Sequence, residues 1–206
     1  GVTAVIPQDY FMGGATIKIG RLEGGGSIIG AGTEELSALG VTAAQGTTDL
    51  ARGTIIVGSQ VANNFYDPRL RPGQEPPAPP DLYDQSLTIE LIKWAEDGTE
   101  IRKKVRARVA GVLDEARDEP DWSIYMPLSD VEGYNTWSTG QRIDRNKNGY
   151  NTVIVKVEDV DVVLDVTDQI TALGFQAYTP QSFVQGISGF YLVLQVVFGA
   201  ILGREQ

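Results

Sequence analysis

Hydrophobic and polar residues alternate most regularly in the middle of the chain, on both sides of an Asp97-Gly98 pair. The apolar positions are Leu87, Ile89, Leu91, Val105, Ala107 and Val109. A period of two places such side chains on one face of a strand, and Asp-Gly is a favoured hairpin turn. The pattern therefore predicts an antiparallel hairpin with a basic outer face, and contact with lipid phosphates is the alternative role for its basic residues. These are Arg102, Lys103, Lys104, Arg106 and Arg108.

Shorter apolar runs, bounded by glycine, proline or polar residues, predict further strands. They cover residues 15–19, 27–30, 53–58, 123–127 and 152–157. Apolar residues at helical spacing predict a helix over residues 160–173 that ends at Gly174, and brief helices are expected at residues 33–39 and 60–65. The order of these elements predicts an α+β fold.

A short internal repeat links the two ends of the chain. Residues 1–10 and 174–183 share a glycine, an alanine, a Pro-Gln pair and a final aromatic residue. Each copy predicts a short strand that is ended by its proline, Pro7 or Pro180. If the repeat is real, both ends belong to one lobe; chance similarity is the alternative, because glycine and proline punctuate many strands.

The last apolar run extends from Ile187 to Leu202. It is shorter than the roughly 20 residues that a membrane-spanning helix needs. We interpret it as the approach to a transmembrane helix, and a terminal helix docked on the domain is the alternative.

The formal net charge of −10 makes nucleic acid an unfavourable partner. The chain has no histidine and no cysteine, which excludes imidazole bases, thiolate nucleophiles and the ordinary zinc sites. Catalysis would need paired carboxylates, a lysine base or a hard metal held by oxygen ligands. The sequence predicts no catalytic residues and no cofactor.

One segment resembles a metal-binding loop. Asp144, Asn146 and Asn148 place oxygen-bearing side chains at alternate positions before Gly149, as in the first half of a calcium loop. The twelfth position holds Val155, whereas a calcium loop closes with a bidentate glutamate. We therefore expect an Asn-Gly turn here and no bound metal, with these three residues as the candidate ligands if one binds.

Two other clusters have both a structural and a functional interpretation. The acidic run at residues 114–121 could bind a cation or a basic peptide, but a charge run is usually a solvated loop between strands. Tyr134, Trp137 and Tyr150 could line a partner site, although aromatic residues more often fill cores.

Several of these stretches occur in a familiar order. They are residues 1–7, 53–62, 109–113, 121–128 and 153–183. Together they resemble the large extracytoplasmic domain, or periplasmic core domain, of MacB/FtsX-like ABC transporter permeases. The resemblance implies a porter-like, membrane-proximal lobe formed by residues 1–40 and 150–186, with an inserted strand-rich, sabre-like lobe at residues 41–149. Residues 187–206 would form a stalk helix leading toward a transmembrane helix.

The resemblance also implies a function. Such a domain is not an enzyme; it sits on the extracytoplasmic face of the cell membrane and couples cytoplasmic ATP hydrolysis to export or signalling. The implied partners are a cytoplasmic ABC ATPase subunit or domain, a second copy of the permease, and an extracytoplasmic protein. A secreted or surface module that binds carbohydrate or peptide is the alternative.

Overall fold

The computed structural model describes residues 1–179, except for the side chains of Asn146 and Asn148. The predicted stalk at residues 187–206 and the last part of the internal repeat lie outside the described residues. The chain divides into two compact units, one of Val5–Ile154 and one of Gly1–Ala4 with the chain from Val155 onward. Within residues 1–179 no helix is long and apolar enough to cross a membrane.

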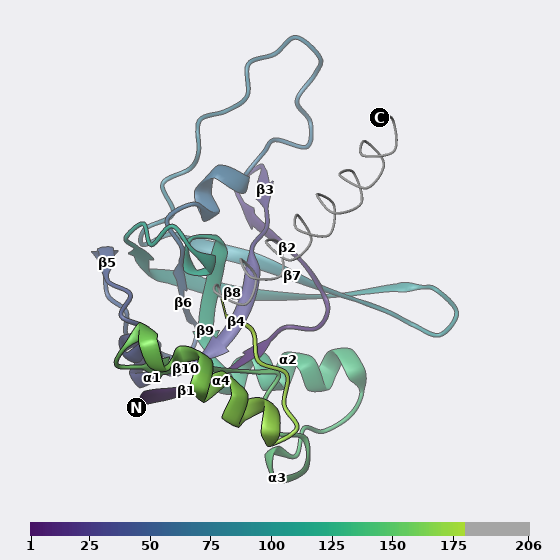
Figure 1. The fold of residues 1–206 in the computed structure, drawn as a ribbon. Coiled ribbons are helices and arrows are strands. Elements are labelled where there is room, and N and C mark those ends of the chain that lie inside the picture. The colour runs from purple at the N-terminus through teal and green to yellow at the C-terminus, as the bar shows by residue number, and fades with distance from the viewer. Residues whose placement is uncertain (180–206) are drawn as a thin grey trace, which may run out of the picture. The chain divides into compact units, whose positions relative to one another are not determined.

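A mixed sheet of ten strands organises the described chain (Figure 1). Its order is β10-β1-β4-β9-β6-β8-β7-β2-β3, and β5 also pairs with β8. The pairs β4·β9 and β6·β8 are parallel. The strands are β1 (Val2–Tyr10), β2 (Gly14–Ile19), β3 (Leu22–Gly24), β4 (Ser27–Ala31), β5 (Ala43–Gly46), β6 (Thr54–Val57), β7 (Ser86–Trp94), β8 (Glu100–Leu113), β9 (Ser123–Pro127) and β10 (Thr152–Val157).

Helices and strands occur together, so the predicted α+β class is confirmed. The α-helices are α1 (Thr33–Leu39), α2 (Leu128–Thr139), α3 (Arg145–Asn148) and α4 (Val163–Ala172). The described part of the chain also has three short 3₁₀ helices, η1 (Val61–Asn64), η2 (Glu119–Trp122) and η3 (Val160–Val162). Strand β4 lies in the predicted lobe of residues 1–40 and 150–186, and β9 in the predicted lobe of residues 41–149. The two strands nevertheless pair in one sheet. The division into two lobes stays a prediction.

The hairpin is formed as predicted, by β7 and β8. Leu87 lies opposite Ala107 and Ile89 opposite Val105, and Gly98 adopts the left-handed backbone conformation, with φ of 80°. The prediction is wrong for Lys103, because it stands at an odd position and therefore shares a face with Val105 instead of Lys104. Its ammonium group lies 5.6 Å from the ring centre of Tyr134 in α2.

Both faces of the central strands are buried, which explains their continuous apolar runs. Ile55 and Val57 of β6 belong to one core, which Val131 of α2 also enters. Ile56 points to the opposite face, where it packs in a second core with Leu36 of α1. Successive residues of one strand therefore supply two cores.

The two ends of the chain differ from the sequence prediction in part. The helix up to Gly174 is confirmed as η3 and α4, and the Gly174 amide donates to the carbonyl of Thr171 (2.9 Å) with φ of 89°. Pro7 does not end its strand, since β1 continues to Tyr10 and pairs there with β4. Residues 175–179 form no strand; Phe175 and Tyr178 are exposed, and no neighbouring strand among residues 1–179 pairs with this segment. Over the described part of the repeat, residues 1–6 and 174–179 therefore do not form the same structure.

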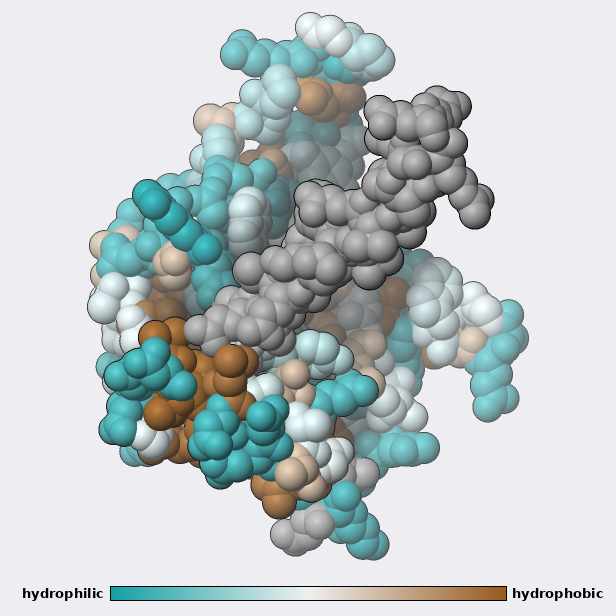
Figure 2. All heavy atoms as spheres, viewed as in Figure 1, coloured by the Kyte–Doolittle hydropathy of each residue, from teal (hydrophilic) through white to brown (hydrophobic). Residues whose placement is uncertain are grey.

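Helix α4 keeps part of its apolar surface exposed. Leu164 is exposed, as is Val160 of η3 just before the helix, and Figure 2 shows hydrophobic residues gathered around the start of α4. Asp161 and Asp165 each stand between apolar neighbours in the sequence. The helix is therefore amphipathic without a fully buried face among the described residues.

Candidate functional site

The predicted metal loop folds as a short helix. The amide of Lys147 donates to the carbonyl of Asp144 (3.0 Å), and that of Gly149 to the carbonyl of Arg145 (3.1 Å). No group of three acidic side chains in the described part of the chain is arranged to hold a metal ion. The side chains of Asn146 and Asn148 lie outside the described structure, so the site at Asp144, Asn146 and Asn148 stays a prediction.

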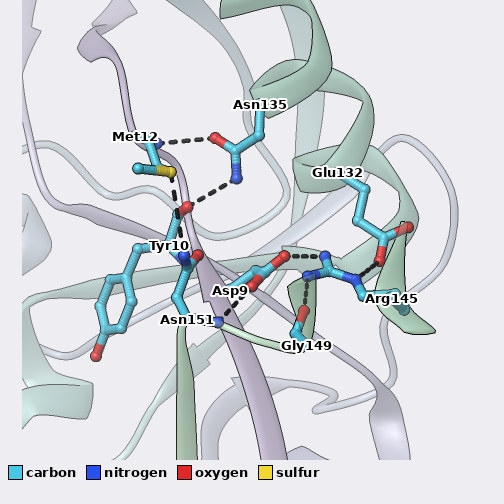
Figure 3. Close-up of polar contacts among 8 residues, drawn as sticks. All are labelled: Asp9, Tyr10, Met12, Glu132, Asn135, Arg145, Gly149 and Asn151. Carbon is cyan, nitrogen blue, oxygen red and sulfur yellow. Dashed lines mark hydrogen bonds and ion pairs between the residues drawn. The ribbon is translucent and has the colours of Figure 1, made fainter. Parts of the chain in front are cut away.

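Arg145, beside that loop, forms a polar network with residues far away in the sequence (Figure 3). Its guanidinium pairs with Asp9 at the end of β1 and with Glu132 of α2 (Nε to Oε1, 2.6 Å), and it donates to the carbonyl of Gly149 (2.6 Å). Asp9 is only 1% exposed. Burial disfavours the charged guanidinium, but hydrogen bonds with Asp9 and Glu132 outweigh it and raise the pKa of Arg145. These ion pairs, one of them with the buried Asp9, therefore fix the α3 segment to β1 and α2.

Two asparagines complete this network around Tyr10 and Met12. Buried Asn135 accepts from the amide of Met12 (2.8 Å) and donates to the carbonyl of Tyr10 (2.9 Å). The side-chain oxygen of Asn151 accepts from the backbone amide of Tyr10 (3.2 Å). The backbone amide of Asn151 donates to the carboxylate of Asp9 (3.0 Å). The end of β1 is thus held from two sides, by α2 and by the segment that enters β10. We call Asp9, Arg145, Glu132, Asn135 and Asn151 the clasp.

The acidic run at residues 114–121 is a loop that is folded around one of its own carboxylates. Asp121 is buried and accepts from the amides of Ala116 (2.8 Å) and Arg117 (2.7 Å) and from the hydroxyl of Ser59 (2.9 Å). These donors lower the pKa of Asp121, the bond from Ala116 being the largest cause and burial opposing it. The expectation of a solvated loop holds for Glu115 but is wrong for Asp121.

The remaining carboxylates of this run have separate partners. Asp118 accepts from the amide of Glu119 (2.8 Å) at the start of η2, and Asp114 accepts from the hydroxyl of Thr42 (2.6 Å). Glu119 accepts from the hydroxyl of Tyr10 (2.5 Å). Burial, followed by this bond to Glu119, raises the pKa of Tyr10. Each of these three carboxylates therefore accepts a hydrogen bond from a group within the domain itself.

The aromatic stretch takes part in packing and cation-π contacts. Tyr134 and Trp137 pack against the first core. The ammonium group of Lys93 lies 4.8 Å from the ring centre of Trp137 and donates to its carbonyl (2.8 Å). Tyr150 lies under the guanidinium of Arg145, 4.6 Å away. The contacts of Lys93 and Lys103 with Tyr134 and Trp137 hold α2 against the β7–β8 hairpin. All three aromatics thus have contacts within the domain, which supports their interpretation as structural.

Three of the five stretches that carried the family resemblance, residues 53–62, 109–113 and 121–128, meet in the middle of the sheet. Residues 54–57 form β6, which pairs with β8 at Arg108–Val112 and with β9 at Ile124 and Tyr125. The amide of Gly58 donates to the carbonyl of Ser123 (2.8 Å), and that of Gln60 to the carbonyl of Asp121 (2.9 Å). The motifs therefore specify the framework of the domain.

Comparison with known proteins supports the family resemblance that these motifs predicted. The family model for MacB-like periplasmic core domains matches residues 2–173. The match defines the class of protein as an extracytoplasmic domain of a MacB/FtsX-like ABC transporter. Because it covers most of the sequence, this chain belongs to the family of MacB-like periplasmic core domains, and the predicted resemblance is confirmed.

One solved structure similar to this chain is the extracellular domain of the noncanonical ABC-type transporter YknZ from Gram-positive bacteria. The sequence identity is 14% and the TM-score 0.47, and the alignment covers 81% of this chain and 71% of the other. No curated protein matches the chain.

Proposed function

We propose that this chain is a non-catalytic coupling domain, which moves as a body with the membrane helices of a permease when ATP is hydrolysed on the cytoplasmic side. Family membership supports the class of function. The clasp is the observation that supports coupling, because it ties the segment just before β10 to the end of β1 and to α2.

Coupling needs stiff connections. A displacement that enters through a flexible loop is absorbed there, whereas one that enters through a fixed segment moves the element to which it is tied. An ion pair with a buried carboxylate is suited to this, because removing Arg145 leaves the charge of Asp9 unpaired in the interior. Asp9 accepts from Arg145 and from the amide of Asn151, so a pull on residues 145–151 is passed to β1.

The finer organisation follows from the family and is part of the proposal. A porter-like lobe of residues 1–40 and 150–186 would lie next to the membrane on its extracytoplasmic face, with a sabre-like lobe of residues 41–149 above it and a stalk at residues 187–206. The full-length permease would work as a homodimer with a cytoplasmic ABC ATPase subunit or domain. The proposal also includes an extracytoplasmic protein that binds to this domain.

The clasp can be tested in the full-length permease, assembled with its ATPase in lipid nanodiscs. This domain contains no cysteine, so Arg52→Cys introduces a single site for a spin label in it. We expect the distance between the labels of the two permease copies to change when ATP and vanadate are added. In Arg145→Gln the ATPase rate should persist, while the change in distance is reduced by more than half.

Arg142→Gln is the matched control, since it removes an exposed arginine three positions earlier and should leave the change in distance intact. Circular dichroism of the variant chains separates loss of coupling from loss of folding. An unaltered change in distance in Arg145→Gln, or no change in the unmodified permease, would contradict the proposal.

A further inference from the structure

The β7–β8 hairpin has one open edge. Strand β8 pairs with β7 along the whole length from Glu100 to Arg108, and with β6 from Arg108 onward. Among residues 1–179 no strand pairs with the β6 side of residues 100–107. Figure 1 shows this part of the hairpin extending away from the other strands. An open edge is a template for a further strand.

The backbone groups that face this edge can be assigned from two hydrogen bonds. The amide of Val109 donates to Gln85 (2.9 Å) on the β7 side, whereas that of Arg108 donates to Gly53 (3.0 Å) on the β6 side. Successive residues of an antiparallel strand direct their backbone groups to alternate edges. The amide and carbonyl groups of Arg102, Lys104 and Arg106 therefore face the open side.

The side chains of the same three residues form a basic row on one face of β8, because they stand two positions apart. Glu90 of β7, only 4% exposed, lies beneath the row and is 3.2 Å from both Arg102 Nη1 and Lys104 Nζ. Lys18 of β2 shares the same carboxylate (3.0 Å). Arg106 is exposed, lies opposite Thr88, and pairs with no acidic residue of the described chain. Arg102 also pairs with Glu100, and Lys18 with Glu23 (2.9 Å). Glu90 and Glu100 together therefore offset two of the three charges in the row, and the excess positive charge lies at Arg106.

We propose that the open edge of β8 at Arg102–Arg106 binds, as an added strand, an extended segment of a partner protein with acidic residues at alternate positions. Backbone bonds to the three outward-facing residues supply affinity that is independent of sequence. Carboxylates at every second position of the added strand project from the same face of the sheet as the basic row and lie beside it. The domain as a whole carries a net charge of −10, so this row is where an acidic segment is attracted rather than repelled.

An anionic lipid surface is a poorer fit for the same row. The tip of the hairpin carries Glu96 and Asp97, which anionic headgroups would repel. Asp97 accepts from the amide of Thr99 (2.9 Å), and this bond is the largest cause of its lowered pKa, so it stays charged. The proposal adds a partner class to the coupling function and does not depend on it, because the 206-residue chain suffices for the test.

The test uses a fluorescein-labelled peptide in which glutamate and threonine alternate over about nine residues, the length of an ordinary strand. A control peptide has the same composition with all glutamates in one block. We expect the alternating peptide to bind roughly tenfold more tightly by fluorescence anisotropy, and to weaken as salt is raised. On binding, amide exchange should slow at residues 102, 104 and 106.

Two variants at one position separate charge from backbone pairing. Arg106→Gln removes the charge and should weaken binding by about two- to fivefold, the range of a cross-strand ion pair. Arg106→Pro also removes the outward amide and should weaken it by roughly tenfold or more, without loss of the β7 pairing. Arg142→Gln is the control, expected to bind like the unmodified chain.

Circular dichroism verifies that each variant is folded. Equal binding of the two peptides, or equal losses in both Arg106 variants, would show a purely electrostatic contact and overturn strand addition. Absence of peptide binding would also overturn it, whether or not the chain binds vesicles of phosphatidylglycerol.

Discussion

The loop at residues 114–121 should depend for its structure on one carboxylate. Asp121 accepts two backbone amides and the Ser59 hydroxyl, all within 2.9 Å, in a buried position. In Asp121→Asn the charge is lost, and an amide NH₂ can replace only part of this acceptor capacity. Hydrogen bonds to a charged group contribute about 1.5–3 kcal/mol each, and partial compensation by the asparagine oxygen leaves an expected loss of about 2–4 kcal/mol.

The same carboxylate predicts a dependence on pH. The pKa of Asp121 is lower in the folded chain than in the unfolded chain. Its contribution to stability is therefore fully present above the unfolded pKa of about 3.9, and is lost as the pH falls through the lower folded pKa. Urea unfolding followed by circular dichroism at neutral pH and near pH 3 measures both effects. The difference between the unmodified chain and Asp121→Asn should be large at neutral pH and shrink in acid.

Glu115→Gln is the control for this experiment, since it neutralises an exposed acid of the same loop and should change stability by less than about 0.5 kcal/mol. If Asp121→Asn is equally mild at neutral pH, or if its effect grows in acid, the carboxylate does not organise the loop and the reasoning fails.

Three other substitutions test the packing, each by urea unfolding of the 206-residue chain. Gln8→Met should raise stability by about 1 kcal/mol, because both polar side-chain atoms of buried Gln8 lack a hydrogen-bond partner; a loss would reveal a partner for this amide. Gly133→Ala should add about 0.5–1 kcal/mol, since this position inside α2 leaves open space for a Cβ atom, and any destabilisation would argue against the helix. Gly58→Ala should cost more than about 2 kcal/mol, because its Cβ would overlap the carbonyl oxygens of Pro120 and Asp121; a neutral result would mean that this close approach is wrong.

Helix α2 shows where the local sequence pattern was insufficient to predict an element of the fold. Leu128, Val131, Tyr134 and Trp137 stand three residues apart, which is a helical signal, but Gly133 and Thr136 lower the intrinsic propensity. The helix is stabilised by its packing over β4, where Val131 lies against Gly30. Such tertiary support is invisible in a local window of sequence.

The sequence by itself determined the features that depend on patterns over a short range of residues. The period of two in Leu87–Val109 specified the β7–β8 hairpin, the apolar spacing up to Gly174 specified α4, and the order of motifs specified the family. Only the tertiary structure decided the clasp and the partners of Asp121. Asp9 and Arg145 are 136 residues apart, and the sequence around a carboxylate does not show whether it faces water or a guanidinium from a distant segment. The physical reason is that periodicity reports which face of an element is buried, whereas an ion pair depends on which elements the fold brings together.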